Sequence, residues 1–525
     1  MRKSMPFAFF LVFAFVLISI PSHYASASAG KNALEASPSY SSAALLPGVT
    51  VDVDVLVTIK APVMAAKEKR PPVAVSLVID RSGSMDEAKK IDYARRAAKT
   101  LVRSLEADDL FALTIYDDTV DVLFPLGPIK DKEKILQMID RIEPRGWTFL
   151  SSGLEMGIKQ LENVKREGPC RVILLSDGLA NKGVTQGEKV AAIGAKARDR
   201  GIGVSAIGLG LDFDEDLMQQ LAQRGGGQYY YIANSESLPS VFRDELNLVV
   251  NSFTKDLRVE FKPSRLEDMG SVKVYGYTYK VDSKTANIEM NDLSSGEERQ
   301  VMLRLKVTAP KSGAADLGTL NLRYLNQVDG KEQEVAVPLK LEVASDENVI
   351  KQLEAERQEE LKEVRDEALL RQADEMHLAA MEELKKGNVQ AARAYLDQPA
   401  QSLAAAAPEN VAIANKLEQM RIDTENLDRA VQDAQLRSQM SKSSKASAYM
   451  SYQGKKAGML LQKGDSGYMV ERLQKALAEQ GFYKGQADGR FGPEVEAAVK
   501  AFQQSKKLDA DGIAGAATLN ALGMK

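Results

Sequence analysis

Histidine and cysteine are nearly absent from this 525-residue chain. Cys170 is the one cysteine, so no intramolecular disulfide can form, and its place at the start of an apolar run predicts a small buried side chain. His23 lies near the N-terminus, and His377 lies in a charged helical pattern that predicts a solvent-exposed position. Zinc peptidases and amidases take two or three histidine ligands, and cysteine peptidases need a Cys and His pair. The composition therefore argues against both classes, although counting does not exclude a glycosidase that uses only carboxylates.

A charge surplus of either sign is also missing. The 69 basic and 73 acidic residues nearly cancel, which predicts no general affinity for nucleic acid or anionic membranes. The segment Gly464-Asp465-Ser466-Gly467 resembles the serine region of a chymotrypsin-like protease, but that chemistry needs a histidine base. We interpret it as the turn that begins a domain.

The N-terminus has the features of a secretory signal peptide. Arg2 and Lys3 precede an apolar run over about 6–20, and small residues in an A-x-A pattern follow at 25–29. We expect 1–29 to be removed, which predicts a secreted protein of the cell wall or periplasm; the alternative is an uncleaved anchor. No cysteine lies near the cleavage region, which argues against a lipid anchor. Elsewhere the apolar runs are too short for a membrane span after signal cleavage.

Hard oxygen ligands follow an apolar run that predicts a buried strand ending at Asp80. Ser82 and Ser84 come next at alternate positions, and Gly83 lets the backbone fold so that both hydroxyls can face one centre. Oxygen ligands of this kind suit Mg²⁺, and Mn²⁺ accepts the same set. The alternative is common turn and helix-capping chemistry, in which the same residues hold only the backbone.

Two later segments can complete the coordination shell. Thr148 lies in a loop before a helical pattern, and Asp177 follows the apolar run 170–176. In an open parallel sheet with helices on both faces, ligands bind beyond the carboxyl ends of the strands. We therefore expect the two acids and three hydroxyls to meet at one edge of a sheet.

These residues, with the strand and helix alternation around them, resemble the von Willebrand factor type A domain. The resemblance covers 71–253 and implies a doubly wound α/β fold with a metal-ion-dependent adhesion site. It implies that the serines and the threonine bind the metal, that the aspartates act largely through water, and that a partner's acidic group takes the last position. The implied metal-site residues are Asp80, Ser82, Ser84, Thr148 and Asp177.

Alternation of apolar and polar residues predicts antiparallel strands on both sides of this domain. One strand lies at 49–60, within a segment that we assign to 36–70. The same pattern returns in 254–345, and turn residues separate the strands there. We interpret these segments as one β-sandwich into which the α/β domain is inserted. The later strands are expected at 255–262, 271–281, 299–309, 318–327 and 332–343.

The chain between 346 and 458 changes in composition twice. Apolar residues at helical spacing over 346–436, with a break at Gly387-Asn388, predict a helical hairpin. We expect a stalk or spacer, and the alternative is a groove for a partner. Residues 437–458 are rich in Ser, Lys, Ala and Gly, which predicts a flexible linker.

Residues 459–525 contain two similar turns, Asp488-Gly489-Arg490-Phe491-Gly492 and Asp511-Gly512-Ile513-Ala514-Gly515. Each turn precedes a helical pattern. The segment resembles the three-helix peptidoglycan-binding domain of cell-wall hydrolases, which implies that it binds peptidoglycan. Most of its apolar residues are expected in the core. The exposed candidates for glycan contact are Tyr483, Asp488, Arg490 and Gln503.

The sequence thus predicts a multidomain protein: an α/β doubly wound, von Willebrand A-like domain inserted in a β-sandwich, a helical hairpin region and a small three-helix C-terminal domain. We expect a binding protein and not an enzyme. Its partners would be peptidoglycan and an unidentified protein that presents an acidic residue to a bound Mg²⁺ or Mn²⁺. The alternatives are a cell-wall hydrolase and a structural protein of envelope integrity.

Overall fold

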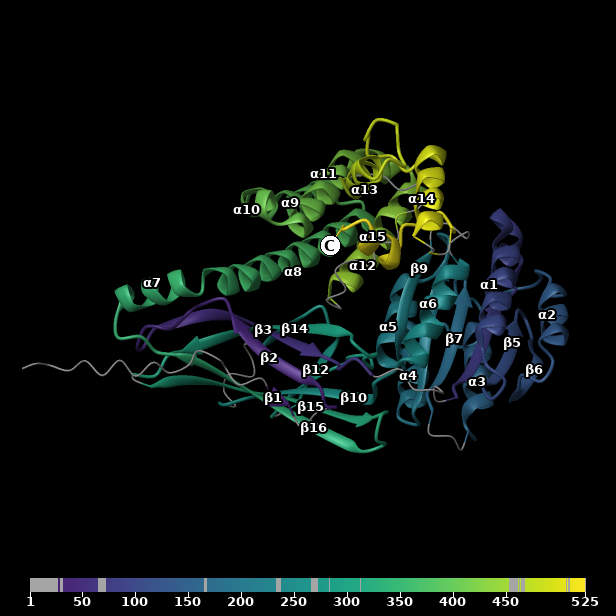
Figure 1. The fold of residues 1–525 in the computed structure, drawn as a ribbon, viewed down its shortest axis with the longest axis horizontal. Helices are drawn as coiled ribbons and strands as arrows, with labels where there is room; N and C mark the ends of the chain where they lie inside the picture. The colour runs from purple at the N-terminus through teal and green to yellow at the C-terminus, as the bar shows by residue number, and fades with distance from the viewer. Residues whose placement is uncertain are drawn as a thin grey trace, which may run out of the picture.

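A computed structural model describes residues 27–28, 32–64, 72–164, 168–232, 238–265, 272–282, 284–311, 313–452, 461, 463, 468–506, 508 and 510–524. The predicted signal peptide lies outside these residues apart from Ala27–Ser28, which form a short strand. Figure 1 shows the α/β domain beside a β-sandwich, a long helix running along the sandwich, and the C-terminal helices near the α/β domain. Among the described residues, no helix is both long and apolar enough to cross a bilayer.

The sandwich consists of two five-stranded sheets, in the orders β1-β2-β3-β14-β11 and β12-β13-β10-β15-β16. In β3, Val53, Val55, Val57 and Ile59 are fully buried in the core between the sheets, as alternation predicts. The strands are β1 (Ala27–Ser28), β2 (Glu35–Tyr40), β3 (Thr50–Lys60), β10 (Thr254–Pro263), β11 (Lys273–Tyr275), β12 (Tyr279–Val281), β13 (Ala286–Ile288), β14 (Glu298–Thr308), β15 (Ala314–Asn326) and β16 (Glu332–Glu342).

The insertion predicted from the sequence is present. Strand β3 precedes the α/β domain, yet it pairs antiparallel with β14 from Thr50 opposite Thr308 to Lys60 opposite Glu298. The single strand expected at 271–281 is wrong, because Gly276 has φ +77° and the chain turns there from one sheet to the other. A side chain at Gly276 would also meet the ring of Tyr452, since an added Cβ would lie 2.0 Å from it.

The α/β domain is built on a six-stranded sheet in the order β6-β5-β4-β7-β8-β9, with only β6 antiparallel. One face packs against α1, α2 and α6, and the other against α3, α4 and α5. The elements are β4 (Ala74–Asp80), η1 (Gly83–Lys89), α1 (Lys90–Ser104), β5 (Leu110–Tyr116), β6 (Val120–Pro128), α2 (Lys132–Asp140), α3 (Leu150–Leu161), β7 (Cys170–Ser176), α4 (Gly187–Arg198), β8 (Ile202–Leu209), α5 (Glu215–Arg224), β9 (Gly226–Ile232) and α6 (Leu238–Val250).

The helical region contains the predicted break, because Gly387 has φ +82° where α8 ends. It is not a stalk, however. Val364 and Ala368 of α8 pack against the sandwich at Leu56, Tyr275 and Met302, and Figure 1 shows α8 lying along that surface. The helices are α7 (Glu347–Glu356), α8 (Gln358–Lys385), α9 (Val389–Asp397), α10 (Ala400–Ala406), η4 (Ala407–Glu409), α11 (Val411–Gln432) and α12 (Ala434–Tyr452).

The prediction of a flexible linker at 437–458 is also wrong for residues 437–452, because they belong to helix α12. Residues 453–458 lie outside the described residues. Tyr449 of α12 is buried, with its ring edge-on to Tyr229 at 5.7 Å between centroids. Its hydroxyl accepts hydrogen bonds from the Tyr229 N–H and from Asn291. Ser441, Lys442 and Lys445, whose residue types suggest a solvated linker, instead contact Glu215 of the α/β domain.

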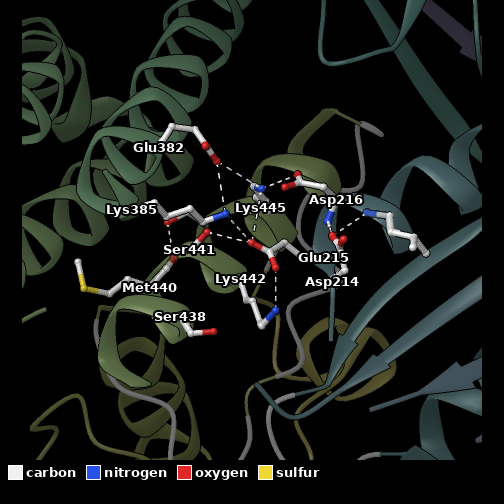
Figure 2. A network of polar contacts seen from close by, with 12 residues as sticks. Asp214, Glu215, Asp216, Glu382, Lys385, Ser438, Met440, Ser441, Lys442 and Lys445 are labelled. Atoms are coloured by element: carbon white, nitrogen blue, oxygen red, sulfur yellow. Dashed lines mark hydrogen bonds and ion pairs between the residues drawn. The ribbon is translucent and has the colours of Figure 1, made fainter. Parts of the chain in front are cut away.

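Glu215, at the start of α5, is the main partner of those lysines (Figure 2). Lys442 Nζ lies 2.7 Å from its carboxylate and also donates to the Phe213 carbonyl at 2.6 Å. Two further lysines contact the same carboxylate. Lys385 of α8 lies 2.8 Å from it, and Lys445 of α12 lies 3.5 Å from it. Burial alone would raise the pKa of Glu215, but hydrogen bonds from Lys385 and Lys442 outweigh it, and the pKa lies below its ordinary value. The network therefore joins α8 and α12 to the α/β domain.

We expect Lys442→Met to weaken this junction, because the substitution keeps the apolar stem but removes a buried ammonium from Glu215. The free energy of unfolding should fall by about 3 kcal/mol, the scale of a broken buried ion pair, as measured by urea denaturation followed by circular dichroism. Lys386→Met is the matched control, since Lys386 pairs with Glu383 at the surface and its side chain is 61% exposed. Equal effects of the two substitutions would contradict the assignment.

His377 is fully buried, so the exposed position predicted for it is wrong. Its Nε2 lies 2.7 Å from Asp423 Oδ2 and 2.9 Å from Ser444 Oγ, and its Nδ1 lies 2.8 Å from Lys416 Nζ. Lys416 in turn contacts Asp374 at 2.7 Å. Burial, and next the Lys416 charge, lower the pKa of His377, while the two acids oppose the change. The residue therefore joins α8, α11 and α12 as a neutral imidazole.

The buried imidazole predicts a loss of stability in acid. Because the pKa of His377 is lower in the folded chain, the unfolded chain takes up a proton there more readily below pH 6.5. The free energy of unfolding therefore falls with decreasing pH, by at most about 1.4 kcal/mol per unit. His377→Gln should show a shallower decline between pH 6.5 and 5 in urea titrations. Other titrating groups contribute to both proteins and cancel in the comparison. Identical slopes would show that His377 does not titrate as described.

Candidate functional site

The carboxyl ends of β4 and β7 bring the first predicted site residues together. These strands are neighbours in the sheet, so Asp80 and Asp177 lie at the same edge. Ser84 Oγ donates to Asp177 Oδ1 at 2.8 Å, and Ser82 Oγ lies 3.2 Å from Ser84 Oγ and 3.5 Å from the same carboxylate oxygen. Two of the predicted hydroxyls and one of the predicted carboxylates therefore lie together at this edge of the sheet.

Thr148 joins this cluster from the loop before α3. Its N–H donates to Asn181 Oδ1 at 2.9 Å, and its carbonyl accepts from the Asn181 N–H at 3.3 Å, which ties the loop to the segment after β7. Gly178 lies beside two of these hydroxyls, because a Cβ there would be 3.1 Å from Thr148 Oγ1 and 3.7 Å from Ser84 Oγ. A larger residue at 178 would crowd the place where these oxygens meet.

Asp80 holds the backbone of the cluster in place through hydrogen bonds. Its Oδ1 accepts the Ser82 N–H at 2.8 Å, and its Oδ2 accepts from Ser176 Oγ at 2.7 Å and from Tyr116 Oη at 3.2 Å. The side chain is fully buried. Burial, and next the charge of Asp177, raise the pKa of Asp80 to about 6. A positive charge in the site would favour the ionised carboxylate.

Lys90 contacts the candidate site, although the sequence analysis did not predict it there. It is the first residue of α1, and its buried Nζ lies 2.8 Å from Asp177 Oδ2, 3.5 Å from the Ser84 carbonyl and 4.0 Å from Asp212 Oδ2. Ala88 and Lys89 adopt left-handed conformations with φ of 50° and 59°, so the chain turns sharply before α1. No local pattern distinguishes Lys90 from an ordinary surface lysine.

The donor set fits a hard divalent cation. The described residues contain no group of three or more His, Cys, Asp or Glu placed to hold a metal. A cation at this site would therefore need hydroxyl oxygens among its ligands. Ser82, Ser84 and Thr148 could hold Mg²⁺ or Mn²⁺, with Asp80 and Asp177 orienting them and balancing charge. In the same site the Lys90 ammonium neutralises Asp177.

The C-terminal domain consists of α13 (Tyr468–Glu479), α14 (Pro493–Ser505) and α15 (Ala516–Ala521), with its own apolar core. A buried glutamine holds each of its two turns. Gln474 donates to Asp488 Oδ1 at 2.8 Å and accepts the Gly489 N–H at 2.8 Å. Gln503 makes the same two contacts with Asp511 and Gly512, at 2.8 and 2.9 Å. The repeated sequence pattern is thus a repeated structure.

Two of the four residues predicted to be exposed for contact with glycan are buried. Gln503 is buried because it holds the second turn, and Tyr483 is buried with its hydroxyl donating to the Gln486 carbonyl at 3.1 Å. Asp488 and Arg490 are exposed on the first turn. These two residues stay candidates for contact with peptidoglycan.

Comparison with known families matches the α/β domain over residues 75–244. This segment is a von Willebrand factor type A domain. Residues 466–522 match a peptidoglycan binding domain. The solved von Willebrand factor type A protein from Catenulispora acidiphila superimposes with a TM-score of 0.55 at 14% identity, covering 82% of this chain and 98% of that one. The similarity to that structure shows the fold. It extends beyond the von Willebrand factor type A domain, here called the A domain.

Curated relatives align over about half of this chain. An uncharacterized protein of Synechocystis is 24% identical over 53% of this chain and 67% of its own length. The uncharacterized protein YfbK of Escherichia coli is 24% identical over 47% of this chain and 44% of its own length. The chain thus spans about two thirds of the first relative and less than half of the second.

We expect Lys90→Met to strengthen metal binding by the A domain, because the ammonium no longer competes for Asp177. The dissociation constant for Mg²⁺ or Mn²⁺, measured by calorimetry on the full chain, should fall roughly tenfold, or about 1.4 kcal/mol. Lys89→Met, at the exposed neighbour, should leave it unchanged, and Asp80→Ala should abolish binding. An unchanged constant in Lys90→Met would show that the ammonium does not compete, and binding that survives Asp80→Ala would place the metal elsewhere.

Proposed function

We propose that this chain is a secreted bacterial protein that attaches to peptidoglycan through its C-terminal domain and binds a protein partner through a cation-dependent site on its A domain. The two matched domains fit a protein that binds the cell wall. The observation that carries the proposal is the convergence of Ser82, Ser84 and Asp177 at the edge of the A-domain sheet, in a chain that also has a wall-binding domain. The signal-like N-terminus supports secretion.

The proposed mechanism is bridging. A bound Mg²⁺ or Mn²⁺ would supply an unsaturated positive centre that a partner's carboxylate can complete. The chain's own residues prepare this contact: Asp80 fixes the backbone at Ser82, Asn181 fixes Thr148, and Gly178 leaves room beside the hydroxyls of Thr148 and Ser84. Because these groups are held before the partner arrives, little ordering is needed on binding.

We further propose that the chain is not a wall hydrolase. His377 is enclosed by Asp423, Lys416 and Ser444. Burial raises the pKa of Cys170, which disfavours the reactive thiolate. Neither residue is therefore placed for catalysis, and both serve packing in our proposal.

The proposal predicts two separable attachments. Full-length protein should sediment with purified peptidoglycan sacculi with or without EDTA, while a chain ending at Tyr452 should stay in the supernatant. Sacculi loaded with the full-length protein should retain an envelope protein from extracts in Mg²⁺ but not in EDTA, and Asp80→Ala should lose that partner while it still sediments.

Three outcomes would contradict the proposal. Sedimentation of the truncated chain would place wall attachment outside the C-terminal domain. Partner retention that survives both EDTA and Asp80→Ala would separate binding from the cation site. Release of soluble fragments from sacculi by the pure protein would show a hydrolase.

A further inference from the structure

A small cavity lies between the A domain and the sandwich. Its volume is about 30 Å³, and its wall includes Cys170 and Ile202, the first residues of β7 and β8, together with Lys255 and Asp256 of β10. Asp177 follows the last residue of β7, so the cavity lies at the opposite edge of the A-domain sheet from the candidate metal centre. It is therefore separate from both attachments proposed above.

Three basic side chains from three elements line the cavity: Arg171 of β7, Arg198 of α4 and Lys255 of β10. Arg198 donates to two backbone carbonyls of the sandwich, at 2.6 and 2.7 Å. Arg171 donates to the Gly226 carbonyl at 2.9 Å, but its buried Nε, 3.6 Å from Glu245, has no hydrogen-bond partner among the described residues. The Lys255 ammonium forms no hydrogen bond or ion pair with any residue that the structure describes.

A glycine lies against each of the three basic side chains. An added Cβ would lie 2.5 Å from Arg171 at Gly203, 2.8 Å from Lys255 at Gly201 and 3.1 Å from Arg198 at Gly226. Gly201 and Gly226 also have positive φ, which by itself favours glycine. Gly203 does not, and it lies within strand β8 opposite Arg171. Its missing side chain leaves the space that the Arg171 guanidinium occupies at the cavity.

The acidic groups of the wall are held by other partners. Asp256 pairs with Arg258 at 3.1 Å, and Asp292 Oδ1 accepts the Leu257 N–H at 2.9 Å. The cavity therefore has a surplus of positive charge, and Lys255 carries it. A partly buried ammonium without a counter-charge is unfavourable, so the cavity suits an anion.

We propose that this cavity binds a small tetrahedral oxyanion, phosphate or sulfate, through Lys255 and Arg171. One water needs about 10–15 Å³ of such volume, so the cavity accommodates an ion larger than a single water. An oxyanion has several acceptor oxygens, which can meet the ammonium of the sandwich and the guanidinium of the A domain at once. The bound ion would join the two units at the strand through which the chain returns to the sandwich.

Calorimetry on the full-length protein tests the proposal. The protein, in metal-free sodium gluconate at constant ionic strength, is titrated with sodium phosphate, sulfate or chloride, and we expect one site for phosphate or sulfate. Lys255→Met should weaken binding roughly tenfold or more, the scale of a lost hydrogen bond to a charged group. Gly203→Ala should also weaken it, because the added methyl displaces the Arg171 guanidinium. Lys262→Met is the matched control, since Lys262 is exposed on the same strand and outside the cavity.

Cys170 provides an independent readout, because it lines the cavity and is the only cysteine in the chain. Burial raises the pKa of its thiol, and the Lys255 and Arg171 charges partly oppose this change. Iodoacetamide reacts with the thiolate. Phosphate should therefore slow alkylation, since the ion covers the thiol and neutralises the nearby charges. The rate in Lys255→Met should respond much less to phosphate.

Each outcome decides the proposal. Binding that Lys255→Met and Gly203→Ala weaken while Lys262→Met does not would support it. Absence of saturable binding by either oxyanion would overturn the site, and equal binding in all variants would place the ion elsewhere. Tighter binding of chloride than of either oxyanion would identify a halide site and overturn the oxyanion assignment. Circular dichroism checks that the variants fold; if Lys255→Met does not, unchanged binding and alkylation in Gly203→Ala would overturn the proposal.

Discussion

The pairing of β3 with β14 is the constraint on which the arrangement of this protein depends. Its two strands lie on opposite sides of the inserted A domain in sequence, yet they pair along their whole length. Closing so long a loop costs conformational entropy, which the buried valines of β3 and their neighbours on β14 must offset. Once the pairing forms, the A domain leaves the sandwich after β3 and returns at β10. Its position is thereby restricted at both ends.

The helices that follow the sandwich in the chain further restrict the position of the A domain relative to the sandwich. Helix α8 packs on the outer surface of the sheet that contains β3 and β14, and α12 packs on the A domain near β9. His377 ties these helices to α11, and Glu215 ties them to the start of α5. The segment 210–214, which α12 holds through Leu211 and Phe213, also contains Asp212 near Lys90. The helical region thus reaches the edge of the sheet that carries the candidate site.

Most residues of the candidate site were predictable because each follows a recognisable local sequence pattern. Asp80, Ser82 and Ser84 are close in sequence, and apolar runs placed Asp80 and Asp177 at strand ends that meet in a parallel sheet. Lys90 was not predictable, because its partner Asp177 is 87 residues away. The burial of His377 depends on Lys416, Asp423 and Ser444, which lie on two other helices.

The same distinction explains the errors in the rest of the fold. The sandwich strands followed from alternation, but the division of 271–281 at Gly276 depends on a glycine whose turn no neighbouring residue signals. A composition of serine and lysine describes a linker only when those side chains face water. In α12, Lys442 and Lys445 instead meet Glu215 and Asp216 of a distant domain. A composition rich in serine and lysine therefore does not distinguish an exposed linker from a helix whose polar side chains pair with another domain.

The glutamine-held turns of the C-terminal domain have a consequence for its symmetry. Gln474 and Gln503 occupy equivalent places, as expected if one helix and turn were duplicated and the copies then diverged. The two turns are alike in these buried contacts but differ at the surface. The third residue of the first turn is the exposed Arg490, whereas the third residue of the second is the buried Ile513. The internal repeat therefore does not give the domain two equivalent surfaces, because its two turns present different side chains to the solvent.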